Sequence, residues 1–252
     1  MDLFFREVGQ GSPVIILHGL FGSSDNWASI AKTISNHYKV YTVDQRNHGQ
    51  SQNTDAFDYN TMADDLYEFI QAQNIDKPSI VGHSMGGKVA MTFALKYPEI
   101  VNKLVIVDIG PKAYPPHHQK ILAGLNAVNL KEINSRKDAD SILAKYEPTL
   151  GVRQFLLKNL YRNDEGDFDW RINVPVITKK ITNVGIEIKS QEPYSNPVLF
   201  IRGANSHYIQ EEDYSEIREI FPRAQIRTIN NAGHWVHAED PKTFVQYLYD
   251  FI

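Results

Sequence analysis

Short apolar runs alternate with amphipathic stretches over the first part of the chain. Val14–Leu17 and Leu104–Val107 are apolar throughout, which is typical of strands buried on both faces of a sheet. Residues 61–73 instead carry apolar side chains at helical spacing. The strands expected here are residues 3–8, 13–17, 39–43, 79–81 and 104–107, and the helices are residues 26–37, 61–73 and 85–96. This alternation predicts an α/β fold with a mostly parallel sheet and helices on both faces.

The pattern changes after Pro111. Residues 112–186 contain short helical patterns and a turn-rich piece, Asn163–Gly166, but no run typical of a buried parallel strand. The core pattern resumes with two strands and a closing helix at Pro197–Ile201, Gln225–Ile229 and Pro241–Phe251. We therefore expect a core of residues 1–111 and 187–252, with residues 112–186 inserted as a helical cap over the carboxyl edge of the sheet.

The sequence Gly82-His83-Ser84-Met85-Gly86 has the spacing G-x-S-x-G. An apolar run precedes it and a helical pattern follows, which is the strand–turn–helix context that a nucleophile elbow requires. In such a turn the serine occupies a strained backbone conformation, and the flanking glycines let the helix pass close to the strand. Ser84 is the candidate nucleophile.

A serine nucleophile needs a general base within hydrogen-bond reach. His234 follows the last expected strand of the sheet, so it should lie at the same sheet edge as Ser84. His234 and His237 are also spaced H-x-x-H, but neither a third ligand nor an accompanying glutamate is present. We expect no metal site there.

Four other histidines are not expected to take part in the chemistry. We expect His18 to brace the loop that bears Leu20, and His48 to brace its own tight loop. His117 and His118 belong to the expected cap and are interpreted as solvated residues.

Negative charge that develops on a substrate oxygen requires two backbone donors. At an elbow, one is the N–H of the residue after the nucleophile, which is Met85. The other comes from the loop after an early strand, where Leu20 follows His18-Gly19. Leu20 and Met85 are therefore the expected oxyanion-hole residues.

Composition narrows the class of protein. The chain has 252 residues, of which 42% are hydrophobic, and a formal net charge of −4. The sequence has no basic stripe of the kind that binds nucleic acid. It also has no apolar run long enough for a membrane-spanning helix. The absence of cysteine excludes disulfides and thiolate chemistry. Residues 1–9 are too short and too charged for a signal peptide. These features favour a cytoplasmic protein without stable membrane insertion.

Several motifs occur together in the order found in the α/β-hydrolase superfamily. They are His18-Gly19, the Asp44–Ser51 loop, Gly82-His83-Ser84-Met85-Gly86-Gly87 and Gly233-His234. The chain resembles that superfamily over essentially its whole length. His18–Ser23, Arg46–Gly49, Gly203–Ser206 and Gly233–Ala238 are most similar to the small bacterial esterases of the YbfF type. The resemblance implies an eight-stranded, mostly parallel sheet and a serine hydrolase that acts on acyl esters and thioesters.

The acid that orients the histidine departs from the family pattern. In most α/β-hydrolases it lies three residues after the glycine that ends the penultimate core strand, and here that position is Ser206. Asp108 ends the strand expected beside the nucleophile strand, so it is the candidate acid. The alternatives are Asp213, Glu211, Glu212 or no acid at all.

We therefore expect a carboxylesterase or thioesterase with the triad Ser84, His234 and Asp108, and with no cofactor. Its substrate would be a small-molecule ester or thioester with a small to medium acyl chain. The motifs also allow C–C bond hydrolysis, lactone opening or perhydrolysis on the same fold. A receptor that retains a slow triad is a further alternative. The oligomeric state is not indicated by the sequence.

Overall fold

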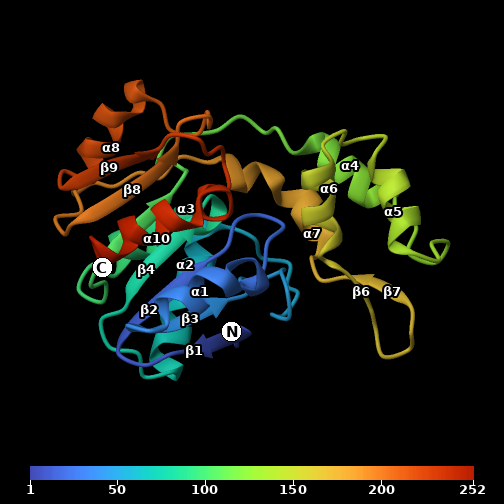
Figure 1. Cartoon of the computed structure of the whole chain (residues 1–252), viewed down its shortest axis with the longest axis horizontal. Helices are drawn as coiled ribbons and strands as arrows, with labels where there is room; N and C mark the ends of the chain where they lie inside the picture. Colours follow the sequence, from blue (N-terminus) through green and yellow to red (C-terminus); the bar gives the residue numbers. More distant parts are fainter.

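A seven-stranded sheet runs through the computed structural model, which describes all 252 residues (Figure 1). Its strands are β1 (Phe5–Val8), β2 (Ser12–Leu17), β3 (Tyr38–Val43), β4 (Ser79–His83), β5 (Leu104–Val107), β8 (Val198–Gly203) and β9 (Ala224–Ile229). The spatial order is β1-β3-β2-β4-β5-β8-β9. Only β1 is antiparallel to its neighbour. The expected mostly parallel sheet is confirmed.

The expectation of eight strands is wrong. The chain has seven segments with the pattern of sheet strands, and each supplies one strand. The turn at Gly9–Gly11 connects β1 to β2 without an intervening segment that could add another. These two strands do not pair with each other, because β3 lies between them and bonds to both.

Helices cover both faces of the sheet, as expected. On one face are α2 (Tyr59–Ala72), α3 (Met85–Lys96) and α8 (Tyr214–Ile220). On the other are α1 (Ala28–Ile34) and α10 (Pro241–Tyr249). Side chains of one strand alternate between these faces: Ile15 and Leu17 pack with the first group, and Val14 and Ile16 with the second. Strands buried on both faces explain the continuous apolar runs.

The segment between β5 and β8 forms a separate group of elements beside the sheet (Figure 1). It contains α4 (Gln119–Ala127), α5 (Arg136–Leu143), α6 (Leu150–Leu157), β6 (Leu160–Arg162), β7 (Phe168–Trp170), α7 (Val174–Lys180) and the 3-10 helix η2 (Ile181–Gly185). β6 and β7 form an antiparallel hairpin around the turn-rich piece, which the expected helical cap did not include. Buried residues of this group, such as Leu156 and Ile177, join the apolar core of the sheet.

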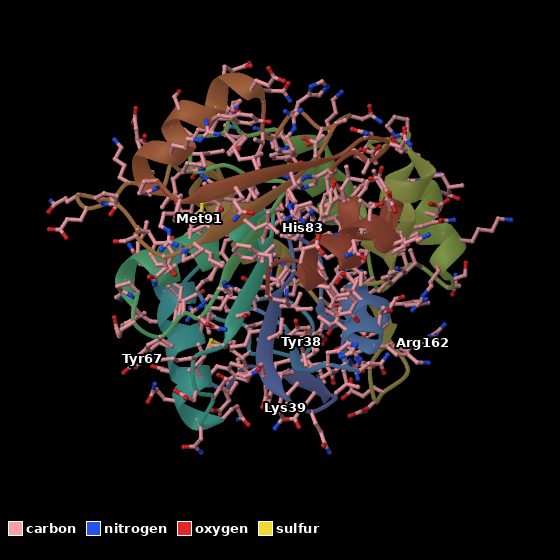
Figure 2. The ribbon with its side chains drawn as sticks, turned by 60° about the vertical axis from the view of Figure 1, so that its left-hand side comes forward. Tyr38, Lys39, Tyr67, His83, Met91 and Arg162 are labelled. Atoms are coloured by element: carbon pink, nitrogen blue, oxygen red, sulfur yellow. The ribbon has the colours of Figure 1, made fainter.

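The carboxyl ends of the parallel strands meet at one edge of the sheet. Figure 2 shows His83, which ends β4, near the middle of the molecule, and Tyr38 and Lys39, which begin β3, toward one end. Loops that follow β2, β4, β5, β8 and β9 therefore converge on this edge, where ligands bind in open α/β sheets.

Candidate active site

Ser84 stands on a strained turn between β4 and α3. Its backbone angles are φ 52° and ψ −118°, a conformation that L-residues rarely adopt. The glycines on either side allow this turn. A Cβ atom at Gly82 would lie 2.3 Å from the carbonyl oxygen of Gly86, and one at Gly86 would lie 2.5 Å from that of Leu17. Strand and helix are thus too close for side chains, which places Ser84 at the tip of the strand.

His234 lies in the loop after β9, with 23% of its side chain exposed. Its Nδ1 lies 2.8 Å from Oδ2 of Asp108. A carboxylate only accepts hydrogen bonds, so Nδ1 of the neutral ring carries the proton and Nε2 is left unprotonated. His234 and Ser84 line the same cavity. The backbone of His234 is held by His83, whose Nε2 donates to the His234 carbonyl oxygen at 2.9 Å.

Asp108 follows β5 and is completely buried, with φ 50°. Besides His234, it accepts from the backbone N–H of Gly203 through Oδ1 at 3.0 Å. The hydroxyl of Ser206 donates to Oδ2. Each carboxylate oxygen is therefore paired, as a buried charge requires.

The alternative acids lie elsewhere. Asp213 forms an ion pair with Lys112, with 2.6 Å between Nζ and Oδ2, and it accepts from the backbone N–H of Gln210. Glu211 and Glu212 are exposed at the start of the 3-10 helix η3 (Glu211–Asp213). The structure brings Asp108, and none of these three, to His234.

Ser206 and Tyr208 make two contacts with the triad that are not evident from the sequence. Ser206 stands in the family's usual acid position and binds the carboxylate that replaces it. The place of Ser206 in the sequence could have indicated this contact, because residue 206 lies at the sheet edge where the acid is needed. The ring of Tyr208 stacks on His234, with 4.1 Å between centroids and 22° between planes. No sequence motif marks this tyrosine.

His117 is exposed, as expected, whereas His118 is partly buried and not simply solvated. Both line the cavity that holds Ser84. His117 Nδ1 donates to the carbonyl oxygen of Pro115, so its Nε2 accepts from the hydroxyl of Tyr208 at 2.6 Å. Burial lowers the pKa of His118 to about 3. The segment that leads into α4 folds back over the sheet edge, which brings both side chains to the site.

The residues expected to supply the oxyanion hole lie next to Ser84. A Cβ atom at Gly19 would lie 3.2 Å from Cβ of Ser84, so the loop that carries Leu20 packs directly against the serine. The Leu20 amide donates no hydrogen bond within the protein. Met85 is the first residue of α3, where backbone N–H groups have no intrahelical partner. Both amides are free to bind a substrate oxygen.

Two buried histidines fix the Leu20 loop. His18 accepts from the backbone N–H of Gln45 through Nε2 at 3.0 Å and donates through Nδ1 to the carbonyl oxygen of Gly19. His48 accepts from the backbone N–H of Phe21 at 3.2 Å. His48 therefore braces the neighbouring loop as well as its own. Burial lowers the pKa of His18 to about 4 and that of His48 to about 3, so both are neutral.

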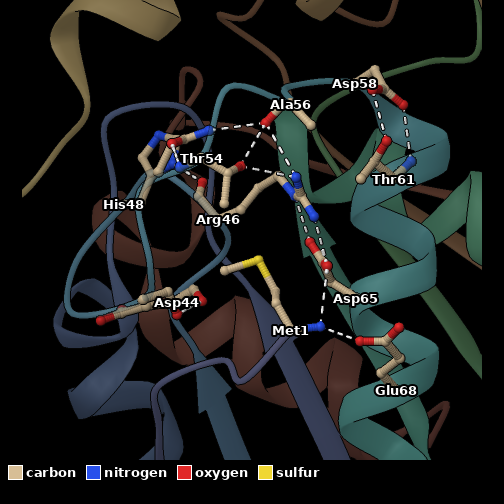
Figure 3. Close-up of polar contacts among 12 residues, drawn as sticks. Met1, Asp44, Arg46, His48, Thr54, Ala56, Asp58, Thr61, Asp65 and Glu68 are labelled. Carbon is tan, nitrogen blue, oxygen red and sulfur yellow. Dashed lines mark hydrogen bonds and ion pairs between the residues drawn. The ribbon is translucent and has the colours of Figure 1, made fainter.

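The loop that carries His48 is itself anchored to α2. Arg46 forms a buried bidentate pair with Asp65, with distances of 2.5 Å and 2.7 Å, and also contacts Thr54 and Ala56 (Figure 3). Bidentate arginine–carboxylate pairs fix geometry as well as charge. The support of the Leu20 loop thus extends to the helix behind it.

His237 does not share a ligand site with His234. It is buried and stacks on Trp27, with 4.0 Å between ring centroids and 12° between planes. No three His, Cys, Asp or Glu side chains gather closely enough to hold a metal ion.

Comparison with known proteins decides the family. Residues 12–241 match the sequence profile described as the alpha/beta hydrolase fold. The chain belongs to the α/β-hydrolase family. This α/β-hydrolase is 40% identical to the sn-1-specific diacylglycerol lipase ABHD11 of Mus musculus over 247 residues, covering 95% of this chain and 80% of the relative. It is 38% identical to the esterase YbfF of Escherichia coli over 233 residues, covering 92% and 89%.

A solved structure described as a marine microorganism esterase is similar to the whole α/β-hydrolase. The TM-score is 0.97 at 44% identity, and the match covers 100% of this chain and 99% of the other. The resemblance to YbfF-type esterases is confirmed. In this α/β-hydrolase, no helix combines the length and apolar character needed to cross a bilayer.

Proposed function

We propose that this α/β-hydrolase is a serine carboxylesterase that cleaves carboxylic esters and thioesters through an acyl-enzyme. The observation that carries this proposal is the 2.8 Å contact between His234 Nδ1 and Asp108 Oδ2, formed where Ser84 lines the same cavity. The names of the similar proteins, which are esterases and a diacylglycerol lipase, support an ester as substrate.

Each group has one task in this mechanism. Nε2 of His234 takes the proton of Ser84 as its oxygen attacks the acyl carbonyl carbon, and later gives it to the leaving alcohol or thiol. Asp108 holds the ring in the required tautomer and stabilises the imidazolium that forms. The amides of Leu20 and Met85 bind the oxyanion. Water then attacks the acyl-enzyme by the same route.

Residues 112–186 are proposed to act as a cap that binds the substrate. Val152, Phe155 and Leu156 of this segment line the cavity at Ser84, together with Trp235 from the core. Tyr146 and Tyr161, two other aromatic residues of the segment, do not line that cavity. Selectivity should therefore respond to Phe155 rather than to cap aromatic residues in general.

The first experiment is Ser84→Ala with p-nitrophenyl acetate as substrate. Loss of the nucleophile should lower kcat by about 10⁴-fold or more, with an unchanged melting temperature because Ser84 contributes little packing. Ser29→Ala, at an exposed serine of α1, is the matched control and should keep the wild-type rate. A Ser84→Ala variant that retained half the activity would contradict the proposal.

Pre-steady-state kinetics distinguish an esterase from a slow receptor. An esterase should release a burst of p-nitrophenol followed by steady turnover. A burst of one equivalent without further turnover would indicate a receptor instead.

A further inference from the structure

Two cavities meet at Ser84. The larger has a volume of about 260 Å³, and its lining includes His234, Trp235 and Phe155. The smaller has a volume of about 20 Å³, and its lining includes Met85 and Ile181 but not His234. Ser84 and Leu20 line both cavities. An ester bound at Ser84 therefore has two directions in which its two halves can extend.

The chemistry of the proposed function assigns the halves. In the tetrahedral intermediate, the substrate carbon is bonded to Oγ of Ser84 and carries an oxyanion, a leaving oxygen and the acyl chain. The oxyanion must face the amides of Leu20 and Met85. The leaving oxygen must lie within hydrogen-bond reach of His234, which has to protonate it. Because His234 lines only the larger cavity, the alcohol half belongs there and the acyl chain must take the remaining direction.

We propose that the smaller cavity is the acyl subsite and the larger one the alcohol subsite, so that the preferred substrates are short-acyl esters of large apolar alcohols. This inference rests on the proposed esterase function and specifies its substrate class. A cavity that holds one water molecule needs about 10–15 Å³, so a volume near 20 Å³ accommodates a group the size of a methyl. Acetyl esters fit this description.

The larger cavity is suited to an apolar alcohol. Phe155 packs near Trp235, with 5.7 Å between ring centroids. Val152, Leu156 and Ile121 complete an apolar wall from the inserted segment. Burial of an alkyl chain against this wall is favourable because it removes apolar surface from water.

The walls of the smaller cavity are held together. Besides core residues, the walls include the first and the last part of residues 112–186, represented by Tyr114 and Gly185. The backbone N–H of Tyr114 donates to the carbonyl oxygen of Gly185 at 2.8 Å, and that of Ile188 donates to Pro111 at the same distance. The hydroxyl of Tyr59 on α2 holds the neighbouring carbonyl of Val184 at 2.6 Å.

Lys88 pins both segments to the helix that begins after the nucleophile. Its side chain is buried, and Nζ donates to the carbonyl oxygens of Pro111, Lys112 and Ile186 at 2.9, 2.7 and 2.7 Å. An ammonium group has three N–H donors, so all three are used. The smaller cavity therefore cannot widen to admit a long acyl chain without breaking these bonds.

A pair of isomeric esters tests the assignment on the wild-type protein. Octyl acetate and ethyl octanoate contain the same atoms but exchange the long chain between the alcohol and acyl halves. We expect kcat/KM for octyl acetate to exceed that for ethyl octanoate by at least about 10-fold, since even one misplaced methylene group can cost that much. Equal rates, or a preference for ethyl octanoate, would overturn the assignment.

The outcomes separate this inference from the proposed function. Comparable hydrolysis of both isomers, lost in Ser84→Ala, would leave the esterase function standing and refute the subsite assignment. No hydrolysis of either isomer or of p-nitrophenyl acetate would refute both.

Two variants locate the subsites. Ile181→Ala enlarges the smaller cavity and should raise the ratio of kcat/KM for ethyl butanoate to that for ethyl acetate. Phe155→Ala should change the ratio of octyl acetate to ethyl acetate instead. Tyr161→Ala, in the same segment but lining neither cavity, is the control and should leave both ratios unchanged. The opposite pattern for Ile181 and Phe155 would mean that the subsites are exchanged.

Discussion

The buried carboxylate of Asp108 accepts several of the hydrogen bonds that hold the site together. It is reached by His234, by Ser206 and by the backbone of Gly203. Asp108 and Ser206 follow β5 and β8, which are paired neighbours in the sheet. The acid has thus moved by one strand relative to the common family position, and a hydroxyl that binds it occupies the position left behind.

Asp108→Asn tests the role proposed for this carboxylate. The amide keeps the size and shape but can present an N–H to His234 where an acceptor is needed, so the wrong tautomer is favoured. We expect kcat/KM to fall by roughly 10³- to 10⁴-fold, with a small change in melting temperature.

Ser206→Ala is the matched comparison. It removes one donor to Asp108 but leaves the contact with His234, so its loss of activity should be far smaller. Equal losses in the two variants would show that Ser206, and not Asp108 alone, sets the orientation of His234.

The sequence allowed Ser84 and His234 to be selected because each follows a strand and belongs to a recognisable motif. Asp108 could be selected from its place at the end of a neighbouring strand. The bond from Ser206 and the stacked ring of Tyr208 could not be predicted. Both contacts depend on which side chains two separate loops bring together, and no local sequence pattern predicts how these loops meet.

At the scale of the elements, the turn between β4 and α3 leaves no space for a side chain at its glycines. A methyl group at Gly86 would lie 2.5 Å from the carbonyl oxygen of Leu17 and 2.6 Å from that of His18. Both are backbone atoms at the end of β2, so no side-chain rotation relieves the clash.

Gly86→Ala should therefore lower the free energy of unfolding by about 1–3 kcal/mol. It should also lower activity, because His18 leads into the loop that bears Leu20. Urea unfolding and kcat measure the two effects. Gly151→Ala is the control, since Gly151 lies in α6 and an added Cβ there meets no atom within 4 Å. A Gly86→Ala variant that matched Gly151→Ala in both measurements would contradict the close packing.

Most elements could be predicted, because buried strands and amphipathic helices have distinct patterns. The exceptions were set by which strands pair with each other. β1 pairs with β3 and not with β2, its neighbour in the chain, and apolar alternation does not specify a partner. The short strands β6 and β7 exist as strands only because they pair with each other.

At the scale of the molecule, buried neutral histidines couple the fold to pH. Burial lowers the pKa of His18 to about 4, and those of His48, His118 and His237 to about 3. In the unfolded chain these groups protonate near pH 6.5. Between these values the unfolded state binds more protons, so stability is full above about pH 6.5 and is lost as the pH falls.

Each histidine that stays neutral in the fold should contribute a slope of about 1.4 kcal/mol per pH unit in this range. We expect the free energy of unfolding, measured in urea, to decrease from pH 7 to pH 5. His37→Asn, at an exposed histidine, should leave the slope unchanged. A wild-type stability that stayed constant from pH 7 to pH 5 would contradict the neutral state of the buried rings.

The residues of the inserted segment that line the cavities could not be predicted from the sequence, because they depend on the packing of the whole molecule. The segment of residues 112–186 contains the aromatic residues Tyr114, Tyr146, Phe155 and Tyr161, and no sequence pattern tells which of them line a cavity. Only Tyr114 and Phe155 line the two cavities at Ser84. Which face of each short helix meets the sheet edge depends on the packing of the entire segment.

The three hydrogen bonds of Lys88 limit how the segment between β5 and β8 can be exchanged for that of a relative. Pro111 and Ile188 are hydrogen-bonded neighbours, so the ends of the segment nearly meet and a short turn could close the chain at little entropic cost. Such an excision would remove the carbonyls of Lys112 and Ile186 and leave a buried ammonium with one of its three acceptors. Burial already lowers the pKa of Lys88 to about 7, so the loss of two acceptors would further disfavour the charged form and destabilise the packing around it. A transplanted segment must therefore bring those carbonyls back, or the recipient core must first replace Lys88 with an apolar residue.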